Sequence, residues 1–368
     1  MARVLFVSKP LVPPWNDSGK NLARDVAAGL RRHEPIVMVD RARAWEPPRG
    51  RAEPIYASPG RFAPPLSSQV RVLARLAAGP RAELWHFFFA PNPKTSLAAR
   101  ACARLRRART VQTICSRPRR VDRARSLLFA DCNVVLSRRT YQDLLDAGVS
   151  RDRLALVAPA VPPLEVPSEE ARRAARAALG LPTEAALVVY PGDLELGEGA
   201  ARTIEAFARL SDGAFLAMAC RAKTPGAAAA ERALRERARA LGIDRRVAWL
   251  GETPRIHDLL GTADVVALPS SDPFAKMDLP LVLLEAMWLA RPVVVAAGAP
   301  AEELADDGAA IAAREDEIAT AIASLLDDDG ARRALGERAR SAAAARFTPS
   351  RMAAEYEALY DRVLEERR

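Results

Sequence analysis

Lysine, histidine and cysteine are all scarce in this 368-residue sequence, and the scarcity narrows the kinds of site that it can hold. The four cysteines lie far apart and include no CxxC pair, which disfavours a zinc site and a disulfide framework. The three histidines show no HxxxH or HExxH spacing, so a histidine-based metal site is not expected. We therefore predict no metal centre built from protein side chains and no bound cofactor.

Long apolar runs are also missing. No run approaches the roughly 20 apolar residues that cross a bilayer, although 49% of the residues are hydrophobic and 27% are charged. The chain begins almost directly with the apolar segment Val4–Val7 and shows no signal-peptide pattern. These features predict a soluble cytoplasmic protein, and the length suits two α/β domains better than a single core.

Acidic residues are sparse in the first half of the chain. Residues 1–165 contain 29 Lys and Arg against 13 Asp and Glu, a net charge of +16, whereas the remainder has 26 against 33, a net charge of −7. One interpretation is attraction to an anionic acceptor or to the inner membrane face, where the protein would be peripheral. The other is the Arg- and Ala-rich composition of a GC-rich bacterial genome. Nucleic acid is not an expected partner, because the basic residues are not interleaved with aromatics and no recognition module is present.

Short runs rich in Val, Leu and Ile alternate with longer helical patterns along the chain. This alternation is typical of βαβ units and predicts parallel sheets that are buried on both faces. In an N-terminal domain of residues 1–162, strands are expected at 3–8, 35–40, 83–89, 110–114, 133–137 and 154–158. The Pro- and Arg-rich segment 41–65 has weak periodicity and is expected to be irregular.

A second α/β series follows the proline-rich connection 159–163, whose prolines favour extended backbone. Its domain is predicted over 163–346, with strands at 187–190, 214–220, 246–250, 264–268 and 292–296. The last segment, 347–368, has apolar residues at helical spacing and is expected to form a closing helix that packs back towards the N-terminal domain. The predicted fold class is therefore α/β, with two Rossmann-like parallel-sheet domains facing a cleft.

Ligands of open parallel sheets bind beyond the carboxyl ends of the strands, so the residues that follow each strand are the candidates. After the first strand, Ser18 and Gly19 suit the start of a helix expected near Asn21, whose free N–H groups would attract a phosphate. We predict donor contacts from Gly19 and Lys20; an ordinary capped loop is the alternative.

His86 lies near the end of the third strand and is a catalytic candidate, with a hydrogen-bonded core histidine as the alternative.

The second half has a corresponding glycine-rich segment after its first strand. Residues 190–199 open a helix, and Gly192 allows backbone N–H groups to approach a diphosphate closely. Three carboxylates in the same segment would repel a dianion. Arg221 and Lys223 follow the next strand and supply cations on the same face.

The lysines form a pattern of their own. Beside fifty arginines there are five lysines, all expected in loops after predicted strands: Lys9, Lys20, Lys94, Lys223 and Lys276. Because a lysine ammonium is a flexible point charge that can follow a phosphate leaving group, we predict that some of them line an anion site. A chance distribution in a small sample is the alternative. Asp278 and Glu285, which follow Lys276, complete the predicted donor side.

Taken together, these segments resemble family 4 glycosyltransferases, which are retaining enzymes of the GT-B fold. The resemblance covers nearly the whole chain and is carried by residues 130–137, 144–149, 155–161, 203–210, 247–251, 263–270, 281–287 and 291–295. It implies a nucleotide-sugar donor in the C-terminal domain and an acceptor, lipid-linked or anionic, on the N-terminal domain. Transfer would retain the anomeric configuration and need no metal. Glu285 matches the second of the family's paired glutamates, which contacts the donor sugar or its ribose.

Several positions depart from the family's pattern. The first paired glutamate falls on Met277, with Asp278 beside it, and an alternative register with an insertion uses 272–274 instead. The sugar-contacting histidine corresponds to Cys115. Asp193 and Glu198 stand where the family has an Arg and a Lys that grip the donor diphosphate. These changes remove positive charge that would stabilise the leaving group.

The predicted function is glycosyl transfer in which Arg221, Lys223 and Lys276 replace the missing cations. Glu285 would orient the donor, and His86 would contact the sugar or the acceptor. A non-catalytic GT-B scaffold that binds carbohydrate or a protein partner is one alternative. A nucleotide-sugar epimerase of similar architecture is another, but the usual pattern of acid/base histidine and carboxylate is absent.

Overall fold

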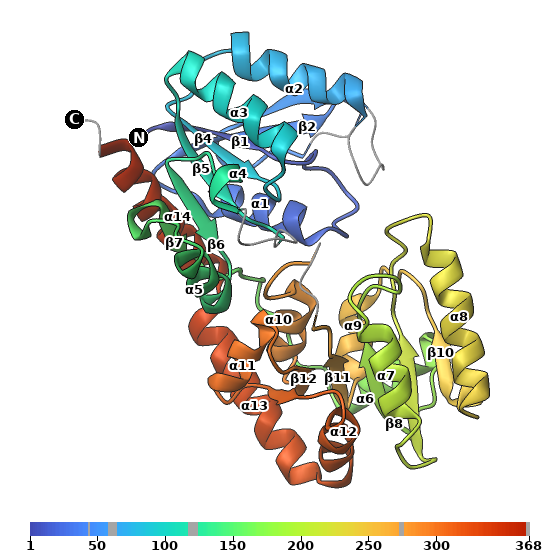
Figure 1. Cartoon of the computed structure of the whole chain (residues 1–368). Helices are drawn as coiled ribbons and strands as arrows, with labels where there is room; N and C mark the ends of the chain where they lie inside the picture. The colour runs from blue at the N-terminus through green and yellow to red at the C-terminus, as the bar shows by residue number, and fades with distance from the viewer. Residues whose placement is uncertain (43–44, 58–64, 117–123, 272–275, 366–368) are drawn as a thin grey trace. The chain divides into compact units, whose positions relative to one another are not determined.

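The chain divides into two compact α/β units (Figure 1). The computed structural model describes residues 1–42, 45–57, 65–116, 124–271 and 276–365. The N-terminal unit contains residues 1–161, the short segment 276–279 and the C-terminal segment from Phe347. The C-terminal unit begins at Pro162 and ends at Arg346, without that short segment.

A seven-stranded sheet, ordered β3-β2-β1-β4-β5-β6-β7, forms the centre of the N-terminal unit, and all its strand pairs are parallel. The strands are β1 (Arg3–Val7), β2 (Glu34–Asp40), β3 (Arg51–Tyr56), β4 (Leu84–Phe88), β5 (Arg109–Thr113), β6 (Cys132–Val135) and β7 (Leu154–Leu156). The helices are α1 (Ser18–Gly29), α2 (Leu66–Ala78), α3 (Pro93–Arg106), α4 (Ala124–Leu127), α5 (Arg138–Asp146) and the final helix α14 (Pro349–Glu365). The central strands β1 and β4 are mostly apolar, because helices cover both faces of the sheet.

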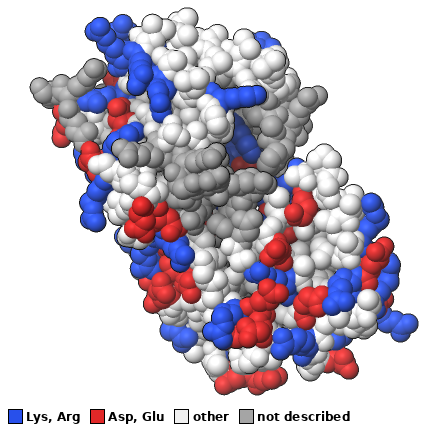
Figure 2. Space-filling view, in the orientation of Figure 1, with Lys and Arg blue, Asp and Glu red and all other residues white. Residues whose placement is uncertain are grey.

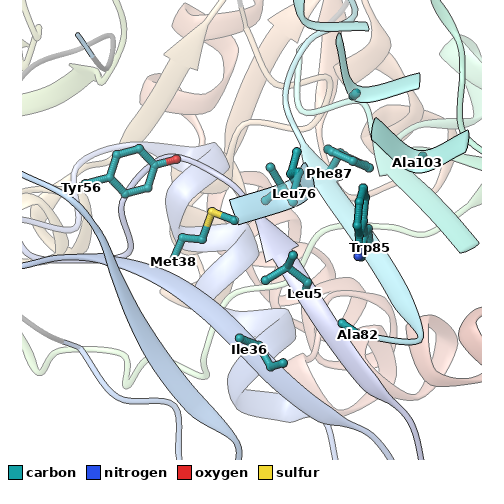
Figure 3. Close-up of a cluster of buried hydrophobic side chains, with 11 residues drawn as sticks. Leu5, Ile36, Met38, Tyr56, Leu76, Ala82, Trp85, Phe87 and Ala103 are labelled. Atoms are coloured by element: carbon teal, nitrogen blue, oxygen red, sulfur yellow. The ribbon is translucent and has the colours of Figure 1, made fainter. Parts of the chain in front are cut away.

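Side chains that alternate along the strands build a separate core on each face of this sheet. On one face, Leu5, Trp85 and neighbouring strand residues pack against Leu76 of α2 and Ala103 of α3 (Figure 3). On the other face His86 lies among aromatic rings that include those of α14. The sheet therefore lies between the α2–α3 layer and a layer that contains α14.

The final helix packs on α1 and β5 of the N-terminal unit. The apolar residues that give its sequence an amphipathic pattern are all buried: Met352, Tyr356, Leu359, Tyr360 and Val363. Gly29 allows the approach of α1 to α14, because a Cβ at that position would lie 2.6 Å from the Cβ of Ala353.

A six-stranded parallel sheet, ordered β10-β9-β8-β11-β12-β13, forms the C-terminal unit. Its strands are β8 (Ala186–Tyr190), β9 (Ala214–Met218), β10 (Val247–Trp249), β11 (Val265–Leu268), β12 (Val293–Ala296) and β13 (Ile311–Ala313). Its helices are α6 (Glu169–Ala178), α7 (Gly199–Phe207), α8 (Ala227–Ala240), α9 (Ile256–Thr262), α10 (Leu281–Trp288), α11 (Glu303–Asp306), α12 (Ile318–Asp327) and α13 (Asp329–Arg346).

Three local predictions were wrong. The segment 41–65, expected to be irregular, contains the edge strand β3, whose Pro54 is tolerated because the strand pairs on one side with β2. The short edge strand β13 was not predicted. The helix expected to begin near Asn21 begins at Ser18, and Asp17 caps it by accepting a hydrogen bond from the Lys20 backbone N–H.

Helices long and apolar enough to cross a membrane are absent from the part of the chain that the structure describes.

Candidate functional site

The order of strands reverses once in each sheet, and this reversal locates the candidate sites. β1 lies between β2 and β4 in the N-terminal unit, and β8 lies between β9 and β11 in the C-terminal unit. At such a switch point the connections after two neighbouring strands leave towards opposite faces and open a crevice at the carboxyl ends. The segments that follow β1, β8 and β11 are therefore where a ligand is expected.

In the N-terminal unit, charged side chains hold the loop after β1 in place. The Lys9 ammonium lies 2.7 Å from an Asp17 carboxylate oxygen, and the other Asp17 oxygen caps α1. The Lys20 ammonium donates to the carbonyl oxygens of Val12 at 2.8 Å and Pro14 at 2.5 Å. Both ammonium groups thus contact other residues of the loop, so their positive charge is partly balanced before any ligand binds.

Gly19 lies against Cys115, which is two residues beyond the end of β5. A Cβ added at Gly19 would lie 3.5 Å from the Cβ of Cys115, so the first turn of α1 lies against the segment after β5. Burial, with a smaller contribution from the charge of Asp17, raises the pKa of the Cys115 thiol to about 12. The thiol is therefore neutral at physiological pH and unsuited to act as a nucleophile.

His86 is fully buried in β4, and both of its ring nitrogens are engaged. Nδ1 lies 2.6 Å from the Tyr360 hydroxyl of α14, and Nε2 lies 2.7 Å from the Thr113 hydroxyl of β5. Thr113 is also 3.0 Å from the Tyr356 hydroxyl. Burial lowers the pKa of His86 well below its usual value. This placement is that of the hydrogen-bonded core histidine that the sequence left as the alternative to a catalytic one.

Asp278 is buried, and it belongs to the short segment 276–279, which is part of the N-terminal unit. Its carboxylate accepts a hydrogen bond of 2.7 Å from Ser137, which also caps α5 through the backbone N–H of Thr140. Lys276 lies in the same segment, and so does Met277, which is buried. The alternative family register through Asp272 lies outside the described residues.

In the C-terminal unit, carboxylates join the loop after β8 to the segment after β9. The Lys223 ammonium lies 2.8 Å from an Asp193 carboxylate oxygen, and both side chains are largely buried. Glu195 accepts hydrogen bonds from the backbone N–H groups of Lys223 at 2.9 Å and Thr224 at 2.7 Å. Burial opposes the ionised form of Glu195, but these bonds prevail and lower its pKa. A parallel β-bridge between Asp193 and Arg221 completes the junction.

The loop after β8 has no room for a side chain at Gly192, because the backbone there passes very close to Tyr190 and Leu268. A Cβ there would lie 2.5 Å from the Tyr190 ring and 2.8 Å from a Leu268 methyl group. The loop is also tied to the segment after β11, because the Ser270 hydroxyl donates to the Gly197 carbonyl oxygen at 2.7 Å. The loops on the two sides of the switch point are thus joined directly.

Glu198 immediately precedes α7 and has left-handed backbone, with φ of 57°. This conformation costs a residue with a Cβ about 1 kcal/mol. Its carboxylate pairs with Arg202 one turn into the helix at 2.8 Å. The first N–H groups of α7 therefore follow a strained turn at the β8 end, where an anion would find partial positive charge.

Glu285 of α10 has a partner that the sequence did not suggest. One carboxylate oxygen lies 3.4 Å from Nε2 of His257 in α9. The hydrogen bond to Glu285 raises the pKa of His257, although burial of the ring works against this shift. His257 follows β10 in the sequence, so the strand-end rule that selected the other candidates could have found it.

Two of the five lysines do not lie in loops as expected. Lys20 and Lys94 occupy the first turns of α1 and α3. A hollow of about 250 Å³ is lined by Trp85, at the start of β4, and by residues that precede β4 and β5: Arg81, Ala82, Glu83, Arg106, Arg107 and Ala108. It therefore lies largely towards the amino ends of these strands, away from the ends where the candidate site is expected. No group of three or more metal-ligating side chains occurs among the described residues.

Comparison with known proteins confirms the predicted resemblance to glycosyltransferases. Residues 171–342 match the family model described as glycosyl transferases group 1. A D-inositol 3-phosphate glycosyltransferase from Xylanimonas cellulosilytica is 33% identical over 228 residues, which cover 58% of this chain and 52% of that protein. The enzyme of the same name from Corynebacterium kroppenstedtii is 30% identical over 183 residues, covering 47% of this chain and 40% of that protein. The chain thus spans about half the length of these curated relatives.

Solved structures are similar over the whole chain. HepE from Anabaena, crystallised with UDP and glucose, has a TM-score of 0.77 at 17% identity, covering 98% of this chain and all of that one. Sucrose-phosphate synthase from Thermosynechococcus elongatus has a TM-score of 0.77 at 18% identity, covering both chains completely. The two Rossmann-like parallel-sheet units are those of the GT-B fold, as predicted.

Proposed function

We propose that this protein is a glycosyltransferase that moves a sugar from a nucleotide-sugar donor to an acceptor. The observation that carries the proposal is the junction at the β8–β11 switch point, where the close-packed loop at Gly192 leads into the start of α7. This junction lies in the unit that matches the glycosyl transferase model. The similar fold of HepE, crystallised with UDP-glucose, supports a nucleotide-sugar donor.

In this proposal the donor diphosphate is met chiefly by backbone N–H groups at the start of α7 and by Arg221. Lys223 contributes less than its charge suggests, because Asp193 already balances it at 2.8 Å. A helix N-terminus carries about half a positive charge and binds phosphate without a metal. Glu285 orients the donor, and its contact with His257 limits the directions in which the carboxylate can point. Transition-state stabilisation would come from these fixed donors as charge develops on the leaving diphosphate.

The remaining features of the proposal follow the resemblance. The acceptor is assigned to the N-terminal unit, transfer retains the anomeric configuration, and neither metal nor cofactor takes part. Gly19 and Lys20 stay proposed donor contacts, and Lys9, Asp17 and Lys20 hold their loop in place. Lys276 and Asp278 stay proposed donor-side residues.

A non-catalytic scaffold is the second candidate, and one observation favours it. The junction after β8 contains Asp193, Glu195 and Glu198, and Lys223 is already paired with one of them. Such a site is poorer in net positive charge than a diphosphate leaving group would favour.

A thermal-shift screen across nucleoside diphosphates and nucleotide sugars separates the two candidates. A ligand that binds the folded state alone at a hundred times its Kd adds about 2.7 kcal/mol of stability. We expect at least one nucleotide sugar to raise the Tm by several degrees. If none of the nucleotides or nucleotide sugars shifts the Tm, the scaffold becomes the better account.

Variants then locate the site by calorimetry with the stabilising nucleotide. Lys223→Ala leaves the Asp193 carboxylate without its paired ammonium beside the β8 loop, and we expect roughly tenfold weaker binding. Lys276→Ala tests the second proposed cation in the same way. The matched control is Arg239→Ala, which removes an exposed cation from α8 of the C-terminal unit, the unit that contains Lys223. Unchanged affinity in both lysine variants would refute their assignment.

A further inference from the structure

The outer surface of α2 exposes large apolar side chains in a regular stripe. Leu66, Val70 and Leu73 are 74%, 56% and 38% exposed. Their spacing of four and three residues places them within about 60° of the helix circumference. The buried side of α2, which includes Leu76 and Val72, packs in the core of the N-terminal unit. An apolar stripe that does not face the core is unusual for a helix of a soluble domain.

The neighbouring helix α3 has the same organisation. Leu97 and Leu105 are 68% and 74% exposed, and the exposed Ala101 lies between them at the same four-residue spacing. Ala99 and Ala103, on the other side of α3, pack in the core beneath. α2 and α3 cover the same face of the sheet, and Arg106 joins them by donating to the carbonyl oxygens of Ala77 and Gly79. Both stripes therefore face away from the same sheet.

Cations surround these stripes, and acids are nearly missing. The sequences of α2 and α3 contain no Asp or Glu. From Leu66 to Arg109 there are nine Lys and Arg residues and one acidic residue, Glu83, which pairs with Arg3 at 2.8 Å. One of the nine, Arg75, is buried and pairs with Glu53 of β3, so it does not add to the surface charge. Lys94, Arg104 and Arg107 are exposed. Figure 2 shows the surface over α2 and α3 as white atoms crossed by blue side chains.

We propose that the α2–α3 surface, defined by Leu66, Val70, Leu73, Leu97 and Leu105 with Lys94 and Arg104, docks this protein on an anionic lipid bilayer. The charge complementarity decides the occupant. A protein partner would be served by the apolar stripes alone, whereas an excess of cations without acids matches a surface that is negative everywhere. Helices of this kind lie in the plane of the membrane interface, with leucines among the acyl chains and Lys or Arg at the headgroups.

The arginine-lined hollow adds to this surface. Arg106 and Arg107 follow Leu105 directly, and Arg81 lines the same hollow. Guanidinium groups bind phosphate in a bidentate manner. The three arginines outnumber Glu83, the acidic residue of the lining, so the charge of the hollow suits a lipid phosphate. This inference goes beyond the proposed glycosyl transfer and does not depend on it.

Co-sedimentation of the full chain with vesicles tests the proposal. We expect binding to phosphatidylcholine vesicles that contain phosphatidylglycerol, weaker binding to pure phosphatidylcholine, and loss of binding as salt rises from about 0.02 M to about 0.5 M. Leu66→Ser, Val70→Ser and Leu73→Ser together should weaken partitioning about tenfold or more. Lys94→Glu with Arg104→Glu should also weaken it at least tenfold.

Matched controls separate this surface from general effects of exposed residues. Leu156→Ser with Val166→Ser replaces apolar side chains that are 41% and 42% exposed elsewhere, and binding should not change. Arg239→Glu with Arg245→Glu makes the same change of charge on exposed arginines of the C-terminal unit. Circular dichroism checks that each variant is folded.

Three results would overturn the proposal. The first is no binding to anionic vesicles at low salt. The second is binding that the α2 and α3 variants leave unchanged. The third is a concentration-dependent dimer that the triple α2 variant abolishes while vesicle binding is absent, which would assign the surface to a second copy of the chain.

Discussion

Replacing His86 by Phe separates a structural from a catalytic role for this residue. Phe keeps a ring of similar size in the core but removes both nitrogens. The Tyr360 hydroxyl then loses its hydrogen bond of 2.6 Å to the His86 ring. The Thr113 hydroxyl loses its hydrogen bond of 2.7 Å to the same ring but keeps the one to the Tyr356 hydroxyl. Because an unsatisfied buried polar group costs roughly 1–3 kcal/mol, we expect the free energy of unfolding to fall by about 2–5 kcal/mol.

The pH dependence of the folding stability tests the structural role of His86 more sharply. Burial lowers the pKa of His86 well below its usual value, whereas in the unfolded chain the pKa is about 6.5. Below pH 6.5 the unfolded state therefore binds a proton that the folded state does not. The stability that neutral His86 provides is complete above pH 6.5 and falls as the pH drops, by roughly 1.4 kcal/mol at pH 5.5.

Urea unfolding at pH 7.5 and pH 5.5 measures both effects. The wild type should lose this increment on acidification, and His86→Phe should not. Tyr360→Phe should lower the free energy of unfolding by about 1–3 kcal/mol at pH 7.5, because it leaves Nδ1 of His86 without its hydrogen-bond partner. Full stability of His86→Phe with loss of transfer activity, or an NMR titration of His86 near pH 6.5, would refute the structural role.

Two further predictions concern the other titrating groups. Because burial raises the pKa of Cys115 to about 12, iodoacetamide at pH 8 should modify it at least a hundredfold more slowly than a free thiol of pKa about 8.5, as peptide mass spectrometry can measure; equal rates would contradict this. Because Glu285 raises the pKa of His257, that contact stabilises the fold fully below about pH 6.5 and is lost as the pH rises through the elevated pKa. Glu285→Gln should return the pKa of His257, followed by NMR, towards 6.5, whereas Asp258→Asn should have a smaller effect; an unchanged pKa in Glu285→Gln would show that the pair does not form in solution.

The sequence predicted the central strands of both sheets, because buried parallel strands are continuous apolar runs bounded by turn residues. It missed β3 and β13 for a common reason. Both are edge strands that pair on one side alone, so β3 can contain exposed Arg51 and Pro54 and β13 needs only three residues. The helix start at Ser18 was missed because Asp17, rather than Ser18, provides the cap.

For the candidate site, the sequence located residues at strand ends but not the partners of those residues. Lys223 pairs with Asp193 across thirty residues, and Ser137 donates to Asp278 across 141. These pairings depend on which strands become neighbours and on how the loops pack, which no local pattern encodes. Charge counting therefore treated Lys223 as an available cation, while the structure shows it balanced by Asp193.

Turnover of a nucleotide sugar tests the proposed function most directly. The measurement is the formation of nucleoside diphosphate, by mass spectrometry, from the nucleotide sugar that stabilises the chain most, in the presence of pooled lipid and soluble sugar acceptors. The proposal predicts catalytic release of diphosphate by the wild type and release reduced at least tenfold in Glu285→Gln. Tight nucleotide binding with no release above the protein-free rate would contradict glycosyl transfer and identify the chain as a binding scaffold.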